Sequence, residues 1–396
     1  MKIAYFTDTF LPQINGVVTS LTTIASALGS SNHKIAIFAP KPKGGRKINW
    51  NPKGTSLELL PSMPAFFYPD WRAAAPVSPS LLLRIRKLNP DIIHFQTTFL
   101  LGVGGIIFGK VLKRPVVGSF HGYFMEPEYL KIVKLPSQTR MVSKILWKYA
   151  SFFLNQCDVV LTYSEGAKKD LERHGVKKPI FVIQNAINEK MIKKVDGGKV
   201  SEVKKLYKLK KKVVLYVGRI SAEKSLDVLI KSFSYAVKEF PDTSLFIIGD
   251  GPIRNSIMKL CADLGIEDNV ILTGNIPQEQ LLTKGYFQTA DVFATASTSE
   301  VQPVSIIEAM YFGLPLVGVA KRGSLEMIGG IGLISQPDDV KSLAKNIAKV
   351  ISDKKLHDEL SEKSLREYKR KYLLEKVVKS YDLFYKEVLK KYTKRN

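Results

Sequence analysis

The sequence predicts an α/β protein with two Rossmann-like, doubly wound domains that face each other across a cleft. Its 396 residues are too many for one hydrophobic core. In each half, short apolar runs of strand length alternate with helical patterns, as in parallel sheets that helices cover on both faces. A stretch with nine lysines and two acidic residues, 191–212, separates the two series. We expect this stretch to be a solvated connection between the domains.

The first domain is expected to span residues 1–190. Its predicted strands are 3–7, 35–39, 92–95, 116–120 and 159–163, with a helical pattern at 17–28. The second domain is expected to span 213–373, with strands at 213–217, 244–248, 270–273, 292–296 and 316–319. The polar sequence from residue 356 onward has helical periodicity. Ligands of such sheets bind beyond the carboxyl ends of the strands, so a site between the domains would collect loops from both.

Two glutamates, Glu300 and Glu308, lie eight residues apart around the start of a predicted helix. Pro303 suits the first helical position, and Gly313 followed by Pro315 ends the helix. Both carboxylates can therefore line a pocket at a helix N-terminus, where unpaired N–H groups favour an anion. Carboxylates also accept hydrogen bonds from hydroxyls. A sugar nucleotide offers both a diphosphate and hydroxyls, whereas the alternative is two solvated charges around an ordinary helix.

Several motifs resemble those of the retaining family 4 (group 1) glycosyltransferases, which have the two-domain B fold. They are the Glu-x7-Glu pattern, Val-Gly-Arg-Ile followed by Glu-Lys at 217–224, Gly-Asp-Gly-Pro at 249–252, Phe-Leu-Pro-Gln-Ile-Asn-Gly-Val at 10–17 and Ser-Phe-His-Gly at 119–122. The resemblance covers nearly the whole chain. It implies that the terminal helix, 374–396, returns to the first domain.

The resemblance assigns roles residue by residue. The catalytic residues would be His121, Glu300, Arg219 and Lys224, and the donor would be bound by Gly16, Gly218, Arg219, Lys224, Glu300, Val304 and Glu308. Arg219 and Lys224 are five residues apart in a strand-to-helix loop, so both can face the phosphate whose negative charge grows as it leaves. His121 would contact the transferred sugar, Glu300 its hydroxyls and Glu308 the ribose. The alternatives are solvated cations in this loop, an ordinary turn glycine at Gly16 and a satisfied core histidine at His121.

The same resemblance implies retention of anomeric configuration without a protein nucleophile. No Asp-x-Asp pair occurs and the five histidines are scattered, so we expect neither a catalytic metal nor a cofactor. The expected co-substrate is a nucleoside-diphosphate sugar, in particular a UDP-hexose. Two departures from the family pattern concern the donor loops: Pro303-Val304 replaces the usual Gly-Leu, and Asn15 stands where glycine is common.

The chain carries a net charge of +24, of which +14 lies in residues 1–190 (25 basic and 11 acidic). Such a charge favours anionic surfaces, either nucleic acid or lipid headgroups, although solubility alone is the alternative. Basic residues alternate with apolar ones and Trp147 over 131–148, which is typical of a membrane-surface helix; the alternative is a helix packed on the sheet. An aromatic loop at 66–71 also favours a membrane. Tyr123, Phe124 and Met125 are placed on the acceptor side.

This part of the sequence is similar to bacterial diacylglycerol glucosyltransferases, which implies a lipid acceptor such as diacylglycerol. We therefore expect a cytoplasmic protein, peripheral at the inner face of the membrane, with no signal peptide or membrane span. Cys157 and Cys261 are expected to be buried free thiols. Two other functions remain open: a non-catalytic protein of this fold that binds nucleic acid or membrane, and a nucleotide-sugar epimerase. No nucleic-acid motif appears, so nucleic acid is not an expected partner, and no protein partner is implied.

Overall fold

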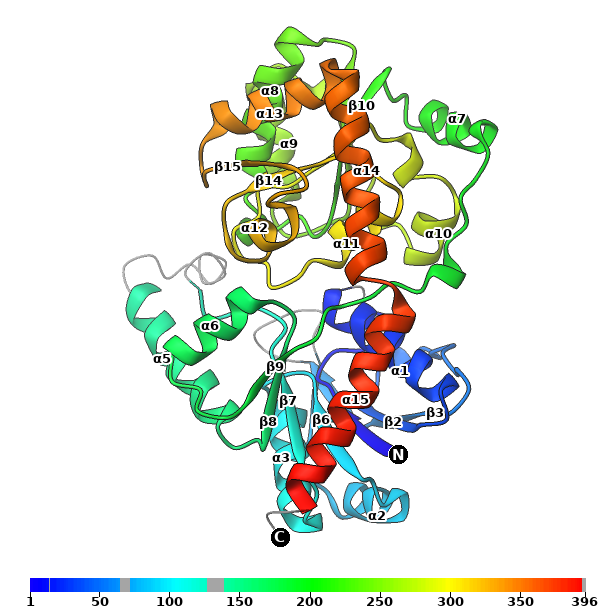
Figure 1. Cartoon of the computed structure of the whole chain (residues 1–396), viewed down its shortest axis with the longest axis vertical. Coiled ribbons are helices and arrows are strands. Elements are labelled where there is room, and N and C mark those ends of the chain that lie inside the picture. The colour runs from blue at the N-terminus through cyan, green and yellow to red at the C-terminus, as the bar shows by residue number, and fades with distance from the viewer. Residues whose placement is uncertain (14, 65–71, 127–138, 394–396) are drawn as a thin grey trace. The chain divides into compact units, whose positions relative to one another are not determined.

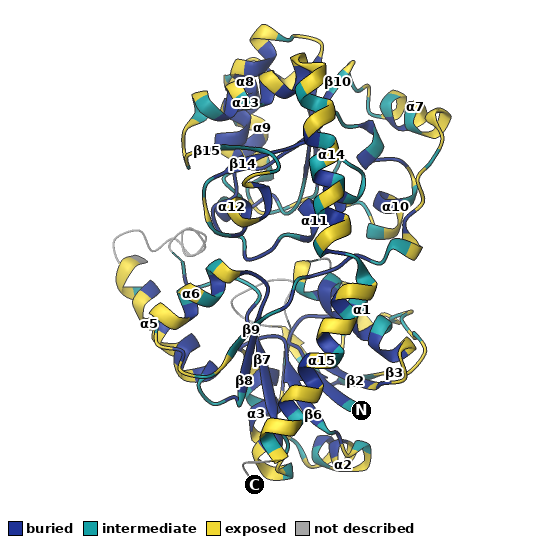
Figure 2. Cartoon of the chain, viewed as in Figure 1, coloured by how far each residue is buried: buried dark blue, intermediate teal, exposed yellow. Residues whose placement is uncertain are grey.

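The computed structural model describes residues 1–13, 15–64, 72–126 and 139–393 (Figure 1). The chain forms two compact units. Unit 1 comprises Met1–Gly122, Met141–Ala186 and Leu374–Asn396, and unit 2 comprises Tyr123–Arg140 and Ile187–Leu373. Each unit is a parallel sheet with helices on both faces. Figure 2 shows the central strands buried and the outer faces of the helices exposed.

The sheet of unit 1 has seven parallel strands in the order β3-β2-β1-β6-β7-β8-β9. They are β1 (Lys2–Phe6), β2 (Lys34–Pro40), β3 (Thr55–Leu60), β6 (Ile92–Phe95), β7 (Val116–Ser119), β8 (Val159–Thr162) and β9 (Ile180–Val182). A short antiparallel pair, β4 (Ser62–Pro64) and β5 (Arg72–Ala74), lies outside this sheet. The strand order reverses between β1 and β6.

Helices cover both faces of this sheet. They are α1 (Gly16–Ser30), α2 (Pro79–Leu88), α3 (Leu100–Leu112), α5 (Thr139–Leu154), α6 (Glu165–Arg173) and α15 (Leu374–Thr393). On one face, apolar residues of α1 and α15 pack with Ile3 and Tyr5 of β1. On the other face Phe6 stacks on Phe108 of α3. The alternation of side chains along β1 thus supplies both cores.

The sheet of unit 2 has six parallel strands in the order β12-β11-β10-β13-β14-β15. They are β10 (Lys212–Val217), β11 (Thr243–Ile248), β12 (Val270–Leu272), β13 (Val292–Ala294), β14 (Leu316–Val319) and β15 (Leu333–Ser335). Its helices are α7 (Gly197–Leu206), α8 (Leu226–Glu239), α9 (Arg254–Asp263), α10 (Gln278–Thr283), α11 (Val304–Tyr311), α12 (Arg322–Ile328), α13 (Val340–Ser352) and α14 (Lys354–Lys371). One core joins α8, α9 and α13 to the sheet, and the other joins α10, α11 and α14.

The lysine-rich stretch 191–212 is not a connection between the units, contrary to the expectation from its composition. Unit 2 begins at Ile187, before this stretch, and α7 lies within it. Ile192 and Val203 are buried in the same core cluster as Leu215 of β10. The lysines therefore occupy the outer side of a packed element, and the core accepts its few apolar residues.

Two further observations concern the whole chain. Cys157 and Cys261 are buried and free, as expected. In the ranges that the structure describes, no helix combines the length and the apolar character that crossing a bilayer needs.

Candidate functional site

Several of the residues assigned to the donor lie where the strand order of unit 2 reverses, between β10 and β13. Gly218 and Arg219 directly follow β10, and Glu300 lies in the loop that leaves β13. In parallel sheets the carboxyl ends at such a switch point are the usual place of a ligand. Residues from two separate parts of the sequence therefore converge at the position that the fold favours.

Lys224 and Glu300 form an ion pair at this position. Lys224 ends a short 3-10 turn, Ala222–Lys224, and its Nζ lies 2.6 Å from Glu300 Oε1. The two side chains are only 20% and 15% exposed. Burial by itself lowers the pKa of Lys224, but the carboxylates of Glu300 and Glu223 outweigh it and raise this pKa. Arg219 is close enough for its charge to act on Lys224 as well.

Glu223 is a buried carboxylate to which sequence reasoning assigned no role. It is 1% exposed, and Ser221 Oγ donates a hydrogen bond of 2.5 Å to its Oε1. Ser299 Oγ donates to the backbone oxygen of Glu223 at 3.1 Å, which ties this turn to the loop of Glu300. Among the described residues, no hydrogen bond reaches Glu223 Oε2. Glu223 directly precedes Lys224 in the motif, and this position is the sequence signal that could have identified it.

Glu308 lies in α11 and is 4% exposed. Gln278 Nε2, from α10, donates a hydrogen bond of 3.0 Å to its Oε1. Burial raises the pKa of Glu308 to about 7. Helix α11 begins at Val304 with Pro303 as its N-cap and ends at Tyr311 with Phe312 as its C-cap, so each end lies one residue inside the predicted one. Gly313 follows with a φ of 71°, as expected for the residue that stops a helix.

The loop of Glu300 is held by the first turn of α12. The backbone N–H of Gly323 donates to the backbone oxygen of Glu300 at 3.0 Å. A Cβ at Gly323 would overlap the carbonyl oxygen of Val301, so only glycine allows this approach. Sequence reasoning missed this contact, because Gly323 belongs to no motif.

In unit 1, the N-terminus of α1 begins at Gly16. Asn15 is the N-cap, and its Oδ1 accepts the backbone N–H of Val18 at 3.0 Å. Asn15 Nδ2 also donates to Thr9 Oγ1 at 2.9 Å, which braces the loop after β1. A Cβ at Gly16 would meet no protein atom within 4 Å. The asparagine that departs from the family pattern is thus a helix cap.

His121 follows β7 and has two polar neighbours. Its Nε2 lies 2.9 Å from Gln96 Oε1 and 2.9 Å from the hydroxyl of Tyr163. Burial lowers its pKa to about 3, so the imidazole is neutral at physiological pH. Sequence reasoning singled out the histidine but neither of its partners, which follow β6 and β8.

The three residues predicted on the acceptor side differ in exposure. Tyr123 and Met125 are buried, at 1% and 0% exposed, whereas Phe124 is half-buried. The guanidinium of Arg322 covers Tyr123, with its Cζ 3.9 Å from the ring centroid, and forms an ion pair of 2.9 Å with Glu126. Tyr123 and Met125 therefore pack inward.

Comparison with known protein families gives matches in both halves of the chain. The family described as Glycosyltransferase Family 4 matches residues 14–190, and the family described as Glycosyl transferases group 1 matches residues 200–367. The chain is 31% identical over 324 residues to alpha-monoglucosyldiacylglycerol synthase of Streptococcus pneumoniae, covering 80% of this chain and 70% of that protein. The chain belongs to the family 4 (group 1) glycosyltransferases. It is therefore a glycosyltransferase.

A second relative and a solved structure are also similar to this glycosyltransferase. It is 25% identical to alpha-monoglucosyldiacylglycerol synthase of Acholeplasma laidlawii, over 80% of each chain. Among solved structures, the Anabaena protein HepE in complex with UDP and glucose superposes with a TM-score of 0.77, covering 98% of this chain and 100% of HepE at 18% identity. At that identity the likeness shows the fold, which is the predicted pair of Rossmann-like domains. Within the described residues, no three His, Cys, Asp or Glu side chains group as metal ligands would.

Proposed function

We propose that this glycosyltransferase moves a hexose from a nucleoside-diphosphate sugar, in particular UDP-hexose, to a hydroxyl of a membrane lipid such as diacylglycerol. The transfer would retain the anomeric configuration and need no metal ion. The observation that carries the donor side is the convergence of Arg219, Lys224 and Glu300 at the switch point of unit 2. Cations there suit a diphosphate, and a carboxylate beside them suits the hydroxyls of a sugar.

The chemistry assigned to these residues is charge stabilisation. The bond between the anomeric carbon and the phosphate oxygen breaks with its electron pair going to the phosphate, and the acceptor oxygen forms the new bond on the same face. The acceptor's proton passes to the leaving phosphate. Lys224 has three N–H donors, so it can hold Glu300 and still donate to the phosphate, while Arg219 meets the same growing charge.

The remaining roles follow the family resemblance. Glu300 would accept hydrogen bonds from the hydroxyls of the hexose, and Glu308 from those of the ribose. Gly16 and Gly218 would let the backbone approach the diphosphate, with Val304 at the start of α11. His121, whose ring is neutral, would hydrogen-bond to the transferred sugar.

The outer side of α5 supports a lipid acceptor. Met141, Ile145 and Phe152 are spaced as one helical stripe and are 58%, 57% and 68% exposed. The basic residues Arg140, Lys144 and Lys148 are exposed beside it, while Trp147, Phe153 and Leu154 pack inward. The inward residues are those expected of a helix packed on the sheet. The exposed outer stripe is the pattern of an interfacial helix. Lys131, Lys134 and the aromatic loop 66–71 lie outside the described residues.

The relatives' names point the same way, since the proteins of S. pneumoniae and A. laidlawii are both named as synthases of a glucosyl-diacylglycerol. A lipid acceptor and an anionic membrane surface together would place this enzyme peripherally on a membrane. We propose that it docks there through the outer side of α5.

The test begins with the donor alone. A panel of nucleoside-diphosphate hexoses is incubated with the enzyme without acceptor, and release of the nucleotide is measured. UDP-hexose is expected to be hydrolysed slowly, and adding vesicles that contain diacylglycerol should give a glycolipid with the anomeric configuration of the donor. A chelator should leave both rates unchanged. Inversion of configuration, transfer only to soluble acceptors, or reversible loss of activity with the chelator would each contradict the corresponding part of the proposal.

A further inference from the structure

A chain of buried hydrogen bonds in unit 1 connects the neighbourhood of His121 with the terminal helix α15. Tyr163, which lies 2.9 Å from His121 Nε2, donates to Ser119 Oγ at 3.2 Å. Ser119 Oγ lies 2.8 Å from His94 Nε2. His94 Nδ1 lies 2.7 Å from the hydroxyl of Tyr385, a residue of α15. We call Tyr163, Ser119, His94 and Tyr385 the relay.

Beyond the relay, the hydroxyl of Tyr385 lies 2.6 Å from that of Tyr5 in β1. The four members of the relay are buried, from 0% to 1% exposed, and they come from β6, β7, the end of β8 and α15. A second tyrosine of α15, Tyr381, is hydrogen-bonded to Tyr163. The terminal helix thus contacts the relay at two points.

With Tyr163 as the donor to Ser119, donation along the relay runs in one direction. Because Tyr163 donates to Ser119, the hydroxyl of Ser119 is left to donate to His94 Nε2. His94 Nε2 is then an acceptor, so Nδ1 carries the proton and donates to Tyr385, which in turn donates to Tyr5. Burial lowers the pKa of His94 well below its usual value and raises that of Tyr385, so both are uncharged.

This direction and the side chain of Gln96 together determine which nitrogen of His121 carries its proton. Nε2 faces two oxygens, Gln96 Oε1 and the hydroxyl oxygen of Tyr163. An amide oxygen only accepts hydrogen bonds, and the proton of Tyr163 is engaged with Ser119. Nε2 must therefore be the protonated nitrogen, which leaves Nδ1 with a free lone pair.

We propose that Tyr385 and His94 are positioning residues for glycosyl transfer, which hold His121 through Ser119 and Tyr163 as the Nε2–H tautomer. Nδ1 of His121 then accepts a hydrogen bond from a hydroxyl of the transferred sugar. This inference rests on the proposed role of His121 at the sugar. The terminal helix is, by this account, part of what prepares the donor-side histidine, as well as a packing element.

The first test is the protonation pattern of His121 in the full-length enzyme. Protein labelled with ¹⁵N-histidine is examined by NMR, and the signals of His121 are assigned with His121→Gln. The wild type is expected to show a protonated Nε2 and a bare Nδ1. Tyr385→Phe removes the hydroxyl that fixes His94, so a population of the Nδ1–H tautomer should appear at His121. An Nδ1–H tautomer in the wild type would overturn the proposal.

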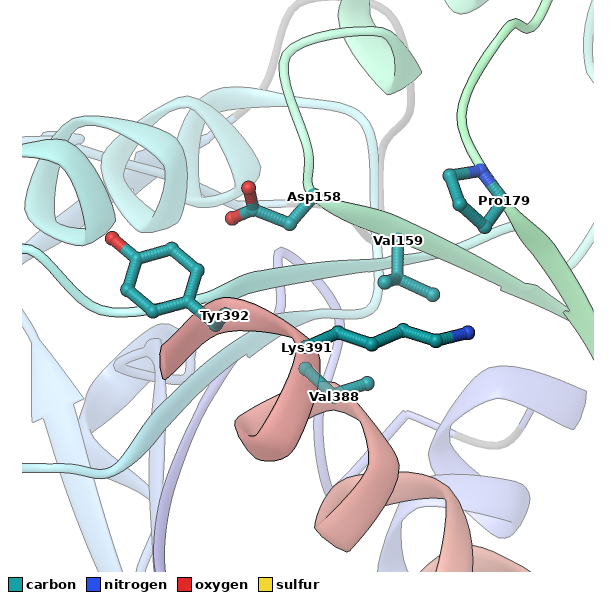
Figure 3. A pocket seen from close by; sticks show the side chains of 6 residues that line it. All are labelled: Asp158, Val159, Pro179, Val388, Lys391 and Tyr392. Atoms are coloured by element: carbon teal, nitrogen blue, oxygen red, sulfur yellow. The ribbon is translucent and has the colours of Figure 1, made fainter. Parts of the chain in front are cut away.

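The second test is turnover, with a matched tyrosine of the same helix as control. Tyr392 also lies on α15, where it lines a small pocket with Asp158 and Val159 at the amino end of β8 (Figure 3). Among the described residues, its hydroxyl makes no hydrogen bond, so Tyr392→Phe should change neither the spectrum nor turnover. Tyr385→Phe should lower kcat/KM for the nucleotide sugar about 10-fold.

Ser119→Ala interrupts the relay at its centre and should give the same two effects. It replaces Tyr385→Phe as the test if that variant fails to fold. A His121 spectrum that remains as in the wild type in either folded variant would overturn the proposal. Full turnover of His121→Ala would instead remove His121 from the proposed function, and the wild-type NMR spectrum would still decide whether the relay fixes its tautomer.

Discussion

Lys224 and Glu300 form an ion pair with each other, although the family resemblance assigns both of them to binding of the donor. Lys224 Nζ and Glu300 Oε1 are 2.6 Å apart and both side chains are largely buried, so each charge has the other as its partner. Sequence motifs singled out both residues, because each belongs to a recognisable pattern. They could not show the ion pair, the buried Glu223 beside it, or the hydrogen bond from Gln278 to Glu308, since these contacts depend on side-chain directions.

Removing either partner should reduce transfer while leaving the protein folded. Lys224→Ala removes a positive charge that would meet the leaving phosphate, and Glu300→Ala removes the acceptor for the sugar hydroxyls together with the partner of Lys224. Each is expected to lower turnover about 100-fold or more. Each should also lower the free energy of unfolding by about 1–3 kcal/mol, since the remaining charge loses its partner.

The control is Lys231→Ala, which breaks the exposed Lys231–Asp227 pair of α8 at 3.5 Å. This change is expected to leave turnover intact and stability within about 0.5 kcal/mol. Steady-state kinetics and urea unfolding measure both quantities. Near-normal turnover in Lys224→Ala would remove that lysine from the mechanism.

Glu308 should make donor affinity depend on pH. Its pKa is raised from 4.5 to about 7, so the folded protein binds the proton more tightly than the unfolded chain. The stability that the protonated carboxyl contributes is therefore fully present below about pH 4.5 and is lost as pH rises through 7. Accepting two ribose hydroxyls favours the ionised form, so donor binding runs opposite to stability.

The affinity for UDP-hexose is expected to rise about 10-fold between pH 6 and 8, as measured by calorimetry. UDP-hexose is chosen over UDP because its diphosphate does not change charge in this range. Glu308→Gln should abolish the dependence. A pH dependence that persists in this variant would assign it to another group.

At the scale of elements, the central strands of both sheets were predictable because each is a short apolar run followed by polar or glycine residues. Strands β1, β7, β10 and β13, which precede residues of the candidate site, were all expected within one or two residues. The edge strands β3, β9 and β15 were not, since half-buried sequences of three to six residues resemble loops. Helix α7 was missed because it begins with two glycines and lies within the lysine-rich stretch 191–212.

The N-terminus of α1 offers a test of a single element. Gly16→Val adds a side chain where no protein atom lies within 4 Å, so the fold should tolerate it. The added group would keep a diphosphate from the backbone, and we expect the Kd for UDP-hexose to rise about 10-fold or more.

Gly197→Val is the matched control, because Gly197 likewise begins a helix, α7, and a Cβ there would also meet no protein atom within 4 Å. Its Kd should stay at the wild-type value. Equal effects of the two substitutions would mean that Gly16 has no special relation to the donor.

At the scale of the whole molecule, the net charge of +24 acts together with the outer side of α5. Charge reversal or neutralisation anywhere on the surface would weaken attraction to an anionic membrane to some degree, because the field of the whole protein contributes. Position should matter more, since headgroup attraction acts mainly on basic residues near the surface and falls off within about a Debye length.

The enzyme should therefore bind vesicles that contain anionic lipid and be released as salt rises. Replacing Arg140, Lys144 and Lys148 by Gln should weaken binding about 100-fold, at roughly 1 kcal/mol for each charge. It should also slow transfer to a lipid acceptor, while hydrolysis of the nucleotide sugar continues.

The same loss of three charges from the α7 region, by replacing Lys199, Lys205 and Lys208 by Gln, serves as control and should weaken binding much less. Vesicle sedimentation measures both variants. Equal weakening would indicate that only net charge matters, and binding that salt does not change would make a soluble acceptor the better proposal.

The division of the chain into units has a consequence for its synthesis. Unit 1 is discontinuous: its last helix, α15, is translated only after the whole of Ile187–Leu373. At about 5–20 residues per second, the ribosome needs roughly 10–40 s for that segment. Throughout this time the nascent first unit has Tyr5 and His94 but not Tyr385, so buried polar groups are without their partner. A chain released before its final helix would carry unit 2 complete and unit 1 unfinished.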